Sequence, residues 1–184
     1  MAEIRLSDGC VARTASPAVI AERDATYAAW VQNVAKKRPV GHETIQIRAR
    51  PSHWTPLRKP LSDCTVALVT TGGVHLKTQP PFAIFEEVGD WSLRAIPGGV
   101  ETTELTVTHS HYATQDALED VNVMFPLDRL RELAQEHVVG KVSSLHYGFM
   151  GFIPDPRPLL SDTVPGMLAE FRDRAVDVVV LTPG

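Results

Sequence analysis

Cysteine is scarce in this sequence of 184 residues, and the two that occur, Cys10 and Cys64, have no metal or redox spacing. Positive charge is not in excess, because the net charge is −4 at pH 7. This excludes the basic surface typical of nucleic-acid or polybasic membrane binding. No apolar run reaches the ~18 residues that a membrane span needs, and the N-terminus lacks the apolar core of a signal peptide. The sequence therefore predicts a cytoplasmic protein with a small-molecule or protein partner, and no membrane or nucleic-acid partner.

Hydrophobic residues make up 43% of the chain and charged residues 22%, which is typical of one globular domain with some additional chain. Residues 1–15 show no period and are predicted to be a mobile arm. Ser16-Pro17 is a typical helix start, and the spacing of apolar residues predicts a helix from Ala18 to Lys37. The predicted organisation is an N-terminal arm and helix over residues 1–45, a proline-rich connector over 46–63 and an α/β domain over 64–184.

Strands and helices alternate in the predicted domain. Val176 to Leu181 is rich in β-branched residues, as in a strand buried on both faces of a parallel sheet, and Thr65–Thr70 has the same character. A third strand is predicted from Val142 into a glycine-containing loop, with helices over Leu127–His137 and Thr163–Ala175. This order predicts an α/β fold with a layered, mostly parallel sheet and flanking helices.

Three other segments complete the expected domain. Trp91–Pro97 alternates as a short edge strand does, and Leu105–Thr108 is the next expected strand. Asp116–Pro126 is expected to be a loop. A strand as apolar as the last one rarely ends a domain, because a following helix normally covers part of the sheet. We therefore expect that the C-terminal part of the domain is missing from this chain.

Histidines follow three of the predicted strands: His75, His109 and His146. Carboxyl ends of parallel strands meet at one edge of a sheet, so we expect these side chains to lie near one another and near Gly184. Histidine changes charge near neutral pH, which favours proton delivery to a leaving group. The predicted catalytic residues are His109, Tyr112 and His146, with His109 as the principal candidate.

Two glycines follow the strand Thr65–Thr70. Gly72 and Gly73 allow a ligand to approach the backbone or form a turn with positive φ, and with His75 they are the predicted substrate-binding residues. The alternatives are a sharp turn for the glycines and histidines that only satisfy backbone carbonyl groups. His109 and His111 have the spacing of a metal pair, but no carboxylate or cysteine completes a ligand set, and no metal is predicted.

Four blocks of the sequence, in this order, resemble the selenoprotein B family of glycine, sarcosine, betaine and D-proline reductases, most of all its D-proline reductase branch. They cover much of the region from about residue 50 to residue 184: TVALVTTGGVH (65–75), VTHSHYATQDALEDVNVMFP (107–126), LDRLRELAQEHVVGKVSSLHYGFMG (127–151) and VDVVVLTPG (176–184). Ser110-His111 replaces a usual pair of glycines, and Ala113 replaces a usual aspartate. The resemblance thus leaves the substrate open.

The resemblance implies a reductive cleavage of a C–N bond in D-proline or a related amine. It places a nucleophilic selenocysteine or cysteine immediately after Gly184, so that this chain stops at an unread selenocysteine codon and is inactive alone. It also implies a partner subunit with a pyruvoyl group and a dithiol reductant, and no cofactor in this chain itself. The alternative is a catalytically inert subunit for small-molecule binding or assembly.

Overall fold

The computed structural model describes residues 2–5, 11–14, 55–84, 89–109, 112–153 and 156–183. The chain divides into two units, Met1–Pro56 and Leu57–Gly184. In the first unit, β1 (Ala2–Arg5) pairs antiparallel with β2 (Val11–Thr14), two strands that the sequence pattern did not predict. The predicted helix from Ala18 to Lys37 lies outside the described residues.

The main sheet of the second unit is built around β3 (Thr65–Thr70), in which every residue is buried. β9 (Val178–Thr182) pairs parallel with one edge of β3. β7 (Lys141–Val142) and β8 (Leu145–Gly148) pair in succession with the other edge, also parallel. β5 (Arg94–Pro97) joins β8 in the antiparallel direction, as an edge strand. The prediction of a mostly parallel sheet is therefore confirmed.

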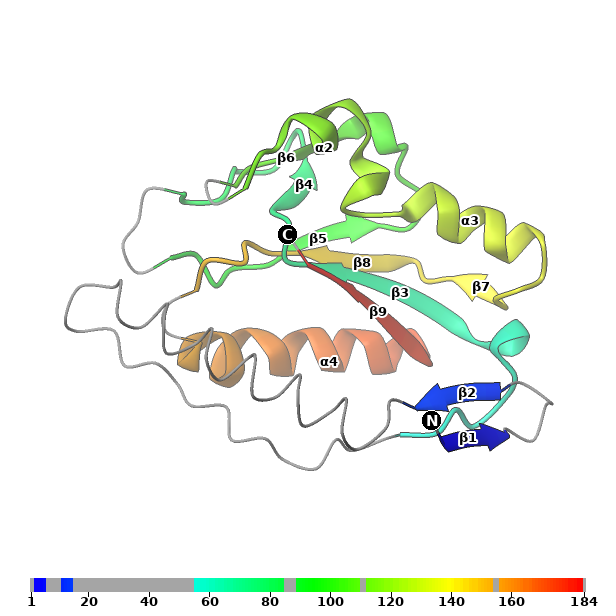
Figure 1. Ribbon diagram of the computed structural model, residues 1–184. Coiled ribbons are helices and arrows are strands. Elements are labelled where there is room, and N and C mark those ends of the chain that lie inside the picture. The colour runs from blue at the N-terminus through cyan, green and yellow to red at the C-terminus, as the bar shows by residue number, and fades with distance from the viewer. Residues whose placement is uncertain are drawn as a thin grey trace. The chain divides into compact units, whose positions relative to one another are not determined.

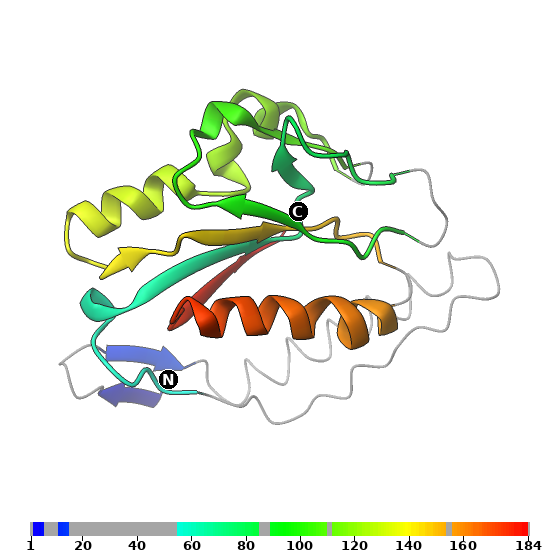
Figure 2. The same cartoon turned by 180° about the vertical axis from the view of Figure 1, so that it is seen from behind.

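Helices flank both faces of this sheet, as Figures 1 and 2 show. α2 (Gln115–Glu119) and α3 (Leu127–Gln135) lie on one side, where Leu127 and Leu130 join the core around Leu68. α4 (Val164–Asp173) lies on the other side and follows a π-helical turn over Leu159–Thr163. Its Phe171 packs in a second core cluster with Ala67, Val69 and Tyr147. The layered α/β architecture is confirmed.

Two shorter segments differ from the prediction. Asp116–Pro126 is not a loop, because α2 and a 3-10 turn over Val121–Val123 form there and bury Ala117 and Val121. β6 (Leu105–Val107) is a strand as predicted, but it pairs antiparallel with β4 (Val74–Leu76) in a separate two-stranded sheet. Further 3-10 turns span Leu61–Asp63 and Thr102–Glu104.

The last strand differs in its burial. β9 was expected to be buried on both faces, but Val179, Val180 and Leu181 are 37%, 40% and 73% exposed. β9 lies outside β3 in the sheet, and in the described part of the chain no strand pairs with its other edge. The prediction of a doubly buried strand is therefore wrong for β9. Among the described helices, none combines the length and the apolar composition that crossing a membrane requires.

Candidate functional site

The carboxyl ends of the parallel strands lie in one row across the sheet. Thr70 at the end of β3 pairs with Thr182 of β9 on one side and with Gly148 of β8 on the other. The backbone N–H of Thr71 donates a hydrogen bond of 3.0 Å to the Thr182 carbonyl. The segment Thr71–Gly73 therefore leaves the sheet directly beside the end of β9. We call this edge, with the residues that pack on Thr71–Gly73, the rim.

Both glycines of the rim hold a turn. Gly73 has φ +72°, and a Cβ atom there would lie 2.2 Å from the Thr108 carbonyl oxygen, so only glycine fits. Its N–H donates to the Phe149 carbonyl at 3.0 Å, and the Gly72 N–H donates to Thr70 Oγ1 at 3.0 Å. Because the protein itself uses both amides, the geometry favours the sharp turn, and the substrate-binding role of Gly72 and Gly73 stays a prediction.

His109 and Tyr112 pack on this turn. The Tyr112 hydroxyl donates a hydrogen bond of 2.6 Å to the Gly72 carbonyl. The His109 and Tyr112 rings lie with centroids 4.6 Å apart, and a Cβ built on Gly73 would touch the His109 Cβ at 3.4 Å. Both side chains are half-buried, and burial raises the pKa of the Tyr112 phenol. The structure thus brings four of the predicted site residues together: Gly72, Gly73, His109 and Tyr112.

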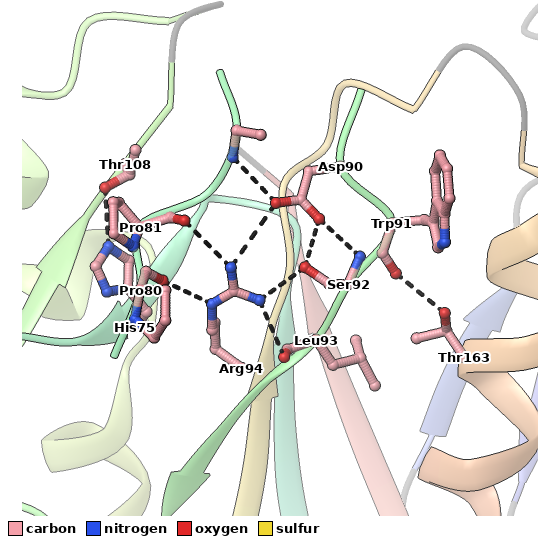
Figure 3. Close-up of polar contacts among 11 residues, drawn as sticks. His75, Pro80, Pro81, Asp90, Trp91, Ser92, Leu93, Arg94, Thr108 and Thr163 are labelled. Atoms are coloured by element: carbon pink, nitrogen blue, oxygen red, sulfur yellow. Dashed lines mark hydrogen bonds and ion pairs between the residues drawn. The ribbon is translucent and has the colours of Figure 1, made fainter. Parts of the chain in front are cut away.

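His75 lies near this group but is 3% exposed. Its Nδ1 donates to the Leu76 carbonyl at 2.8 Å, and its Nε2 accepts from the Thr108 hydroxyl at 2.8 Å (Figure 3). Burial lowers the pKa of His75 below its ordinary value, although the hydrogen bond to Leu76 acts in the opposite direction. The residue is therefore a neutral imidazole with both ring nitrogens bonded inside the protein, and its contact with substrate stays a prediction.

His146 lies in the core on the face that carries α3, with no exposed surface. Its Nδ1 accepts a hydrogen bond of 2.8 Å from the Leu68 N–H, so the proton of the neutral ring is on Nε2, for which the described residues provide no hydrogen-bond partner. Burial, together with the charge of Arg131, lowers the pKa of His146 to about 4. The geometry favours a structural role, and the catalytic role predicted for His146 stays untested.

One polar cluster at this edge, around Arg94, was not predicted from the sequence. Arg94 pairs with Gly148 across the sheet, and its guanidinium donates to the Pro80 carbonyl at 2.8 Å, the Pro81 carbonyl at 3.2 Å and the Ser92 hydroxyl at 2.7 Å (Figure 3). It also stacks over the Phe82 ring, 4.3 Å from its centroid. An arginine in an alternating strand carries no signal of such a cluster, which only the loop before β5 completes.

Asp90 closes the Arg94 cluster. Burial alone would raise the pKa of Asp90, but hydrogen bonds from Ser92 and from the Ala83 N–H outweigh it and hold the pKa below its ordinary value. The carboxylate lies 3.8 Å from the Arg94 guanidinium. These contacts tie the loop of Pro80 and Pro81 to the start of β5, beside the rim.

Histidine, cysteine and carboxylate side chains are the groups that bind a metal ion in proteins. Among the residues that the structure describes, no three histidine, cysteine, aspartate or glutamate side chains gather in a way that holds a metal ion. His111, the second residue of the metal-pair spacing, and Gly184, after which the nucleophile is expected, lie outside the described residues.

The sequence is similar to one protein family over most of its length. The sequence profile of the glycine/sarcosine/betaine reductase selenoprotein B family matches residues 49–183. D-proline reductase subunit gamma of Acetoanaerobium sticklandii is 39% identical over 134 residues, which are 73% of this chain and 54% of that protein. The chain thus spans about half the length of this relative.

Two further relatives match over shorter regions. Glycine reductase complex component B subunit gamma of Carboxydothermus hydrogenoformans is 32% identical over 98 residues, 52% of this chain and 22% of that protein. Betaine reductase complex component B subunit beta of Peptoclostridium acidaminophilum is 33% identical over 99 residues, 50% of this chain and 22% of that protein. No solved structure matches the chain.

Proposed function

Because this chain belongs to the glycine/sarcosine/betaine reductase selenoprotein B family, we propose that it is part of an amino-acid reductase complex that cleaves the C–N bond of D-proline or a related amine. The similarity to D-proline reductase subunit gamma supports this choice of substrate class. One structural observation carries the proposal: the end of β9 is fixed against Thr71–Gly73, on which His109 and Tyr112 pack.

The nucleophile in this proposal is a selenocysteine or cysteine that follows Gly184 in the complete polypeptide. Two hydrogen bonds hold the end of β9 in place, and this supports a reactive residue shortly after it. The Thr182 carbonyl accepts the Thr71 N–H, and the Thr182 hydroxyl donates to the Met124 carbonyl at 2.7 Å. These bonds fix the end of β9 at the rim.

His109 is the residue that we propose to move a proton. The nucleophile donates an electron pair to the carbon and forms a bond to it as the C–N bond breaks. The nitrogen keeps the electron pair of the broken bond and takes a proton from a ring nitrogen of His109. Tyr112 packs on the His109 ring while its hydroxyl is held by the Gly72 carbonyl, so it orients the histidine. General acid catalysis of this kind typically contributes about 10²- to 10⁴-fold to a rate.

The proposal includes two partners. A separate subunit carries the pyruvoyl group that activates the amine, and a dithiol returns the complex to its reduced state. The role of Tyr112 and His109 depends on neither assignment, because it concerns only the proton on the leaving nitrogen.

The test compares polypeptides of two lengths. One is the 184-residue chain, and the other continues in frame with cysteine at the next position; each is assayed with the pyruvoyl subunit and a dithiol for turnover of D-proline. We expect turnover only from the longer polypeptide. Turnover by the 184-residue chain would remove the role of a nucleophile after Gly184.

A variant of the longer polypeptide tests His109. His109→Gln is expected to lower kcat about 10²-fold or more without a change in the thermal unfolding midpoint. The matched control is His137→Gln, on an exposed residue after α3, which should leave kcat unchanged. Full activity of His109→Gln would end the assignment.

An inert subunit for binding or assembly is the alternative function. It predicts that the longer polypeptide enters the complex but that replacing the residue after Gly184 with alanine has no effect on turnover. Burial of His75 and His146 gives no support to a single anion site formed by the three histidines. The genomic codon after that of Gly184 is the first observation to make.

A further inference from the structure

Thr108 joins β6 to His109, and two hydrogen bonds hold it. Its backbone N–H donates to the Gly73 carbonyl at 2.9 Å, and its hydroxyl lies 2.8 Å from His75 Nε2. β6 ends at Val107, so both bonds act beyond the last residue of the strand. One bond leaves a segment free to turn about it, whereas two bonds at different atoms fix its direction. The direction in which the chain enters His109 therefore depends on both bonds.

The ring of His75 presents one defined tautomer to Thr108. A carbonyl group only accepts hydrogen bonds, so the Leu76 carbonyl, 2.8 Å from His75 Nδ1, places the proton on Nδ1. Nε2 of the neutral ring then accepts, and the Thr108 hydroxyl is the donor. His75 is 3% exposed, so loss of this hydroxyl would leave a buried acceptor without its partner.

The Arg94 cluster packs on His75 through one aromatic ring. The buried Phe82 ring meets the His75 ring in a T-shaped contact, with centroids 5.7 Å apart. The Arg94 guanidinium lies over the same Phe82 ring, 4.3 Å from its centroid. In Figure 3 the dashed line from Thr108 reaches the His75 ring beside this cluster. Burial and the positive charge of Arg94 both lower the pKa of His75, which favours the neutral ring.

We propose that His75 is a positioning residue, which fixes Thr108 and, through it, the direction of His109. The Arg94 cluster keeps the His75 ring in place and neutral. Both ring nitrogens of His75 are bonded within the protein, which agrees with a role through Thr108 rather than with contact to substrate. This inference rests on the proposed function, because His109 is the proposed proton donor. A displacement of a reacting group by about 1 Å can lower a rate about 10²-fold.

Two variants of Thr108 separate the hydroxyl from the shape of the side chain. Thr108→Val keeps the shape and removes the donor, whereas Thr108→Ser keeps the donor. In the polypeptide that continues past Gly184 with cysteine, Thr108→Val should lower kcat about tenfold with KM unchanged, because His109 is displaced but the substrate still binds. Thr108→Ser should retain most of the parent kcat. Thr103→Val, at an exposed position, is the control and should leave kcat unchanged.

Nuclear magnetic resonance gives a readout that does not depend on activity. The chain of 184 residues is labelled at the histidine ring nitrogens, and His109→Gln identifies the signals of His109. Thr108→Val should shift the ring signals of both His75 and His109, whereas Thr108→Ser should leave them close to those of the parent. A purely structural bond lowers the unfolding midpoint but leaves the His109 signals in place, and this result overturns the inference.

Phe82→Leu tests the support that the Arg94 cluster gives to His75. Leucine keeps an apolar side chain but removes the ring that contacts both groups. We expect shifted His75 signals and a smaller fall in kcat than in Thr108→Val. This variant also gives the answer where Thr108→Val does not fold, because it retains the threonine hydroxyl. Parent signals together with the parent kcat overturn the role of the cluster.

The two readouts also separate this inference from the proposed function. Full activity of His109→Gln, with His109 signals that shift in Thr108→Val, ends the role of His109 as proton donor but leaves its positioning by His75 intact. Loss of activity in His109→Gln, with parent kcat and parent signals in Thr108→Val, keeps the proposed function and overturns the inference.

Discussion

Gly73 is the residue of the rim with the strictest steric demand. Its φ of +72° disfavours any side chain, and the Thr108 carbonyl lies 2.2 Å from where a Cβ would be. Gly73→Ala should therefore lower the free energy of unfolding by about 2 kcal/mol or more, because strained backbone and steric overlap add. Chemical denaturation measures the change.

Gly99→Ala provides the comparison for Gly73→Ala. A Cβ on Gly99 meets no atom within 4 Å, so this variant should retain the stability of the parent chain. Equal free energies of unfolding for both variants would show that the turn at Gly73 accommodates a Cβ atom without a loss of stability.

His146 gives stability a pH dependence. Its pKa is about 4 in the folded chain, against about 6.5 in an unfolded one, so the unfolded state binds the proton more readily. The contribution of His146 to the free energy of unfolding is fully present above pH 6.5. It decreases as the pH falls toward 4 and does not change further below pH 4. A difference of this size corresponds to roughly 3 kcal/mol at most.

His146→Asn tests this dependence. The asparagine carbonyl accepts the Leu68 N–H but does not titrate, so the loss of stability between pH 6.5 and 4 should become smaller in this variant. Urea unfolding at several pH values measures it, with His137→Asn as the control. An unchanged slope in His146→Asn would mean that other groups set the acid sensitivity.

At the scale of the element, Arg94 joins β5 to the loop before it. Its side chain is 13% exposed and bonds three carbonyl groups and a hydroxyl with the planar fork that only arginine has. Arg94→Lys keeps the charge but loses most of these bonds, so we expect a loss of about 2 kcal/mol in thermal or chemical unfolding. Arg129→Lys, at a 62% exposed ion pair, should change stability by less than about 0.5 kcal/mol.

Local patterns predicted most elements of the α/β unit. The apolar run Thr65–Thr70 predicts β3, and the helical spacing after Leu127 predicts α3, because each pattern depends only on the residues of that element. They did not predict that β9 lies at the sheet edge, since strand order depends on contacts between distant segments. α2 was missed because it is short and buries only Ala117.

Which residues come together in the candidate site could be predicted only in part, because this too depends on contacts between distant segments. Residues after β3 and β6 meet at the rim, and His109 lies beside Tyr112. The parallel order does not explain this meeting, because β6 belongs to the separate antiparallel sheet with β4. His146 instead lies within β8 on the core side, whereas its neighbour Tyr147 packs on the opposite face. Which of these two residues faces the core depends on which face of the sheet α3 covers. The sequence around His146 alone does not determine that face.

For the whole molecule, the exposed valines and leucine of β9 predict a gain in stability from added chain. A polypeptide that continues in frame past Gly184 should unfold several degrees higher than residues 1–184, because burying a Val or Leu side chain contributes about 1.5–3 kcal/mol when complete. Calorimetry of both lengths measures this. The same midpoint for both, or an equal gain in a longer polypeptide with Leu181→Lys, would contradict the expectation.

Pairing of β3 with β9 also governs the order of folding. Thr65 and Asp177, whose backbone and side chain bond where the two strands begin, are 112 residues apart in sequence. The loop that joins β3 to β9 is longer than the loops that join β3 to β7 and β8, so its closure costs more entropy. The strand that ends at the rim is therefore expected to be the last one to join the sheet.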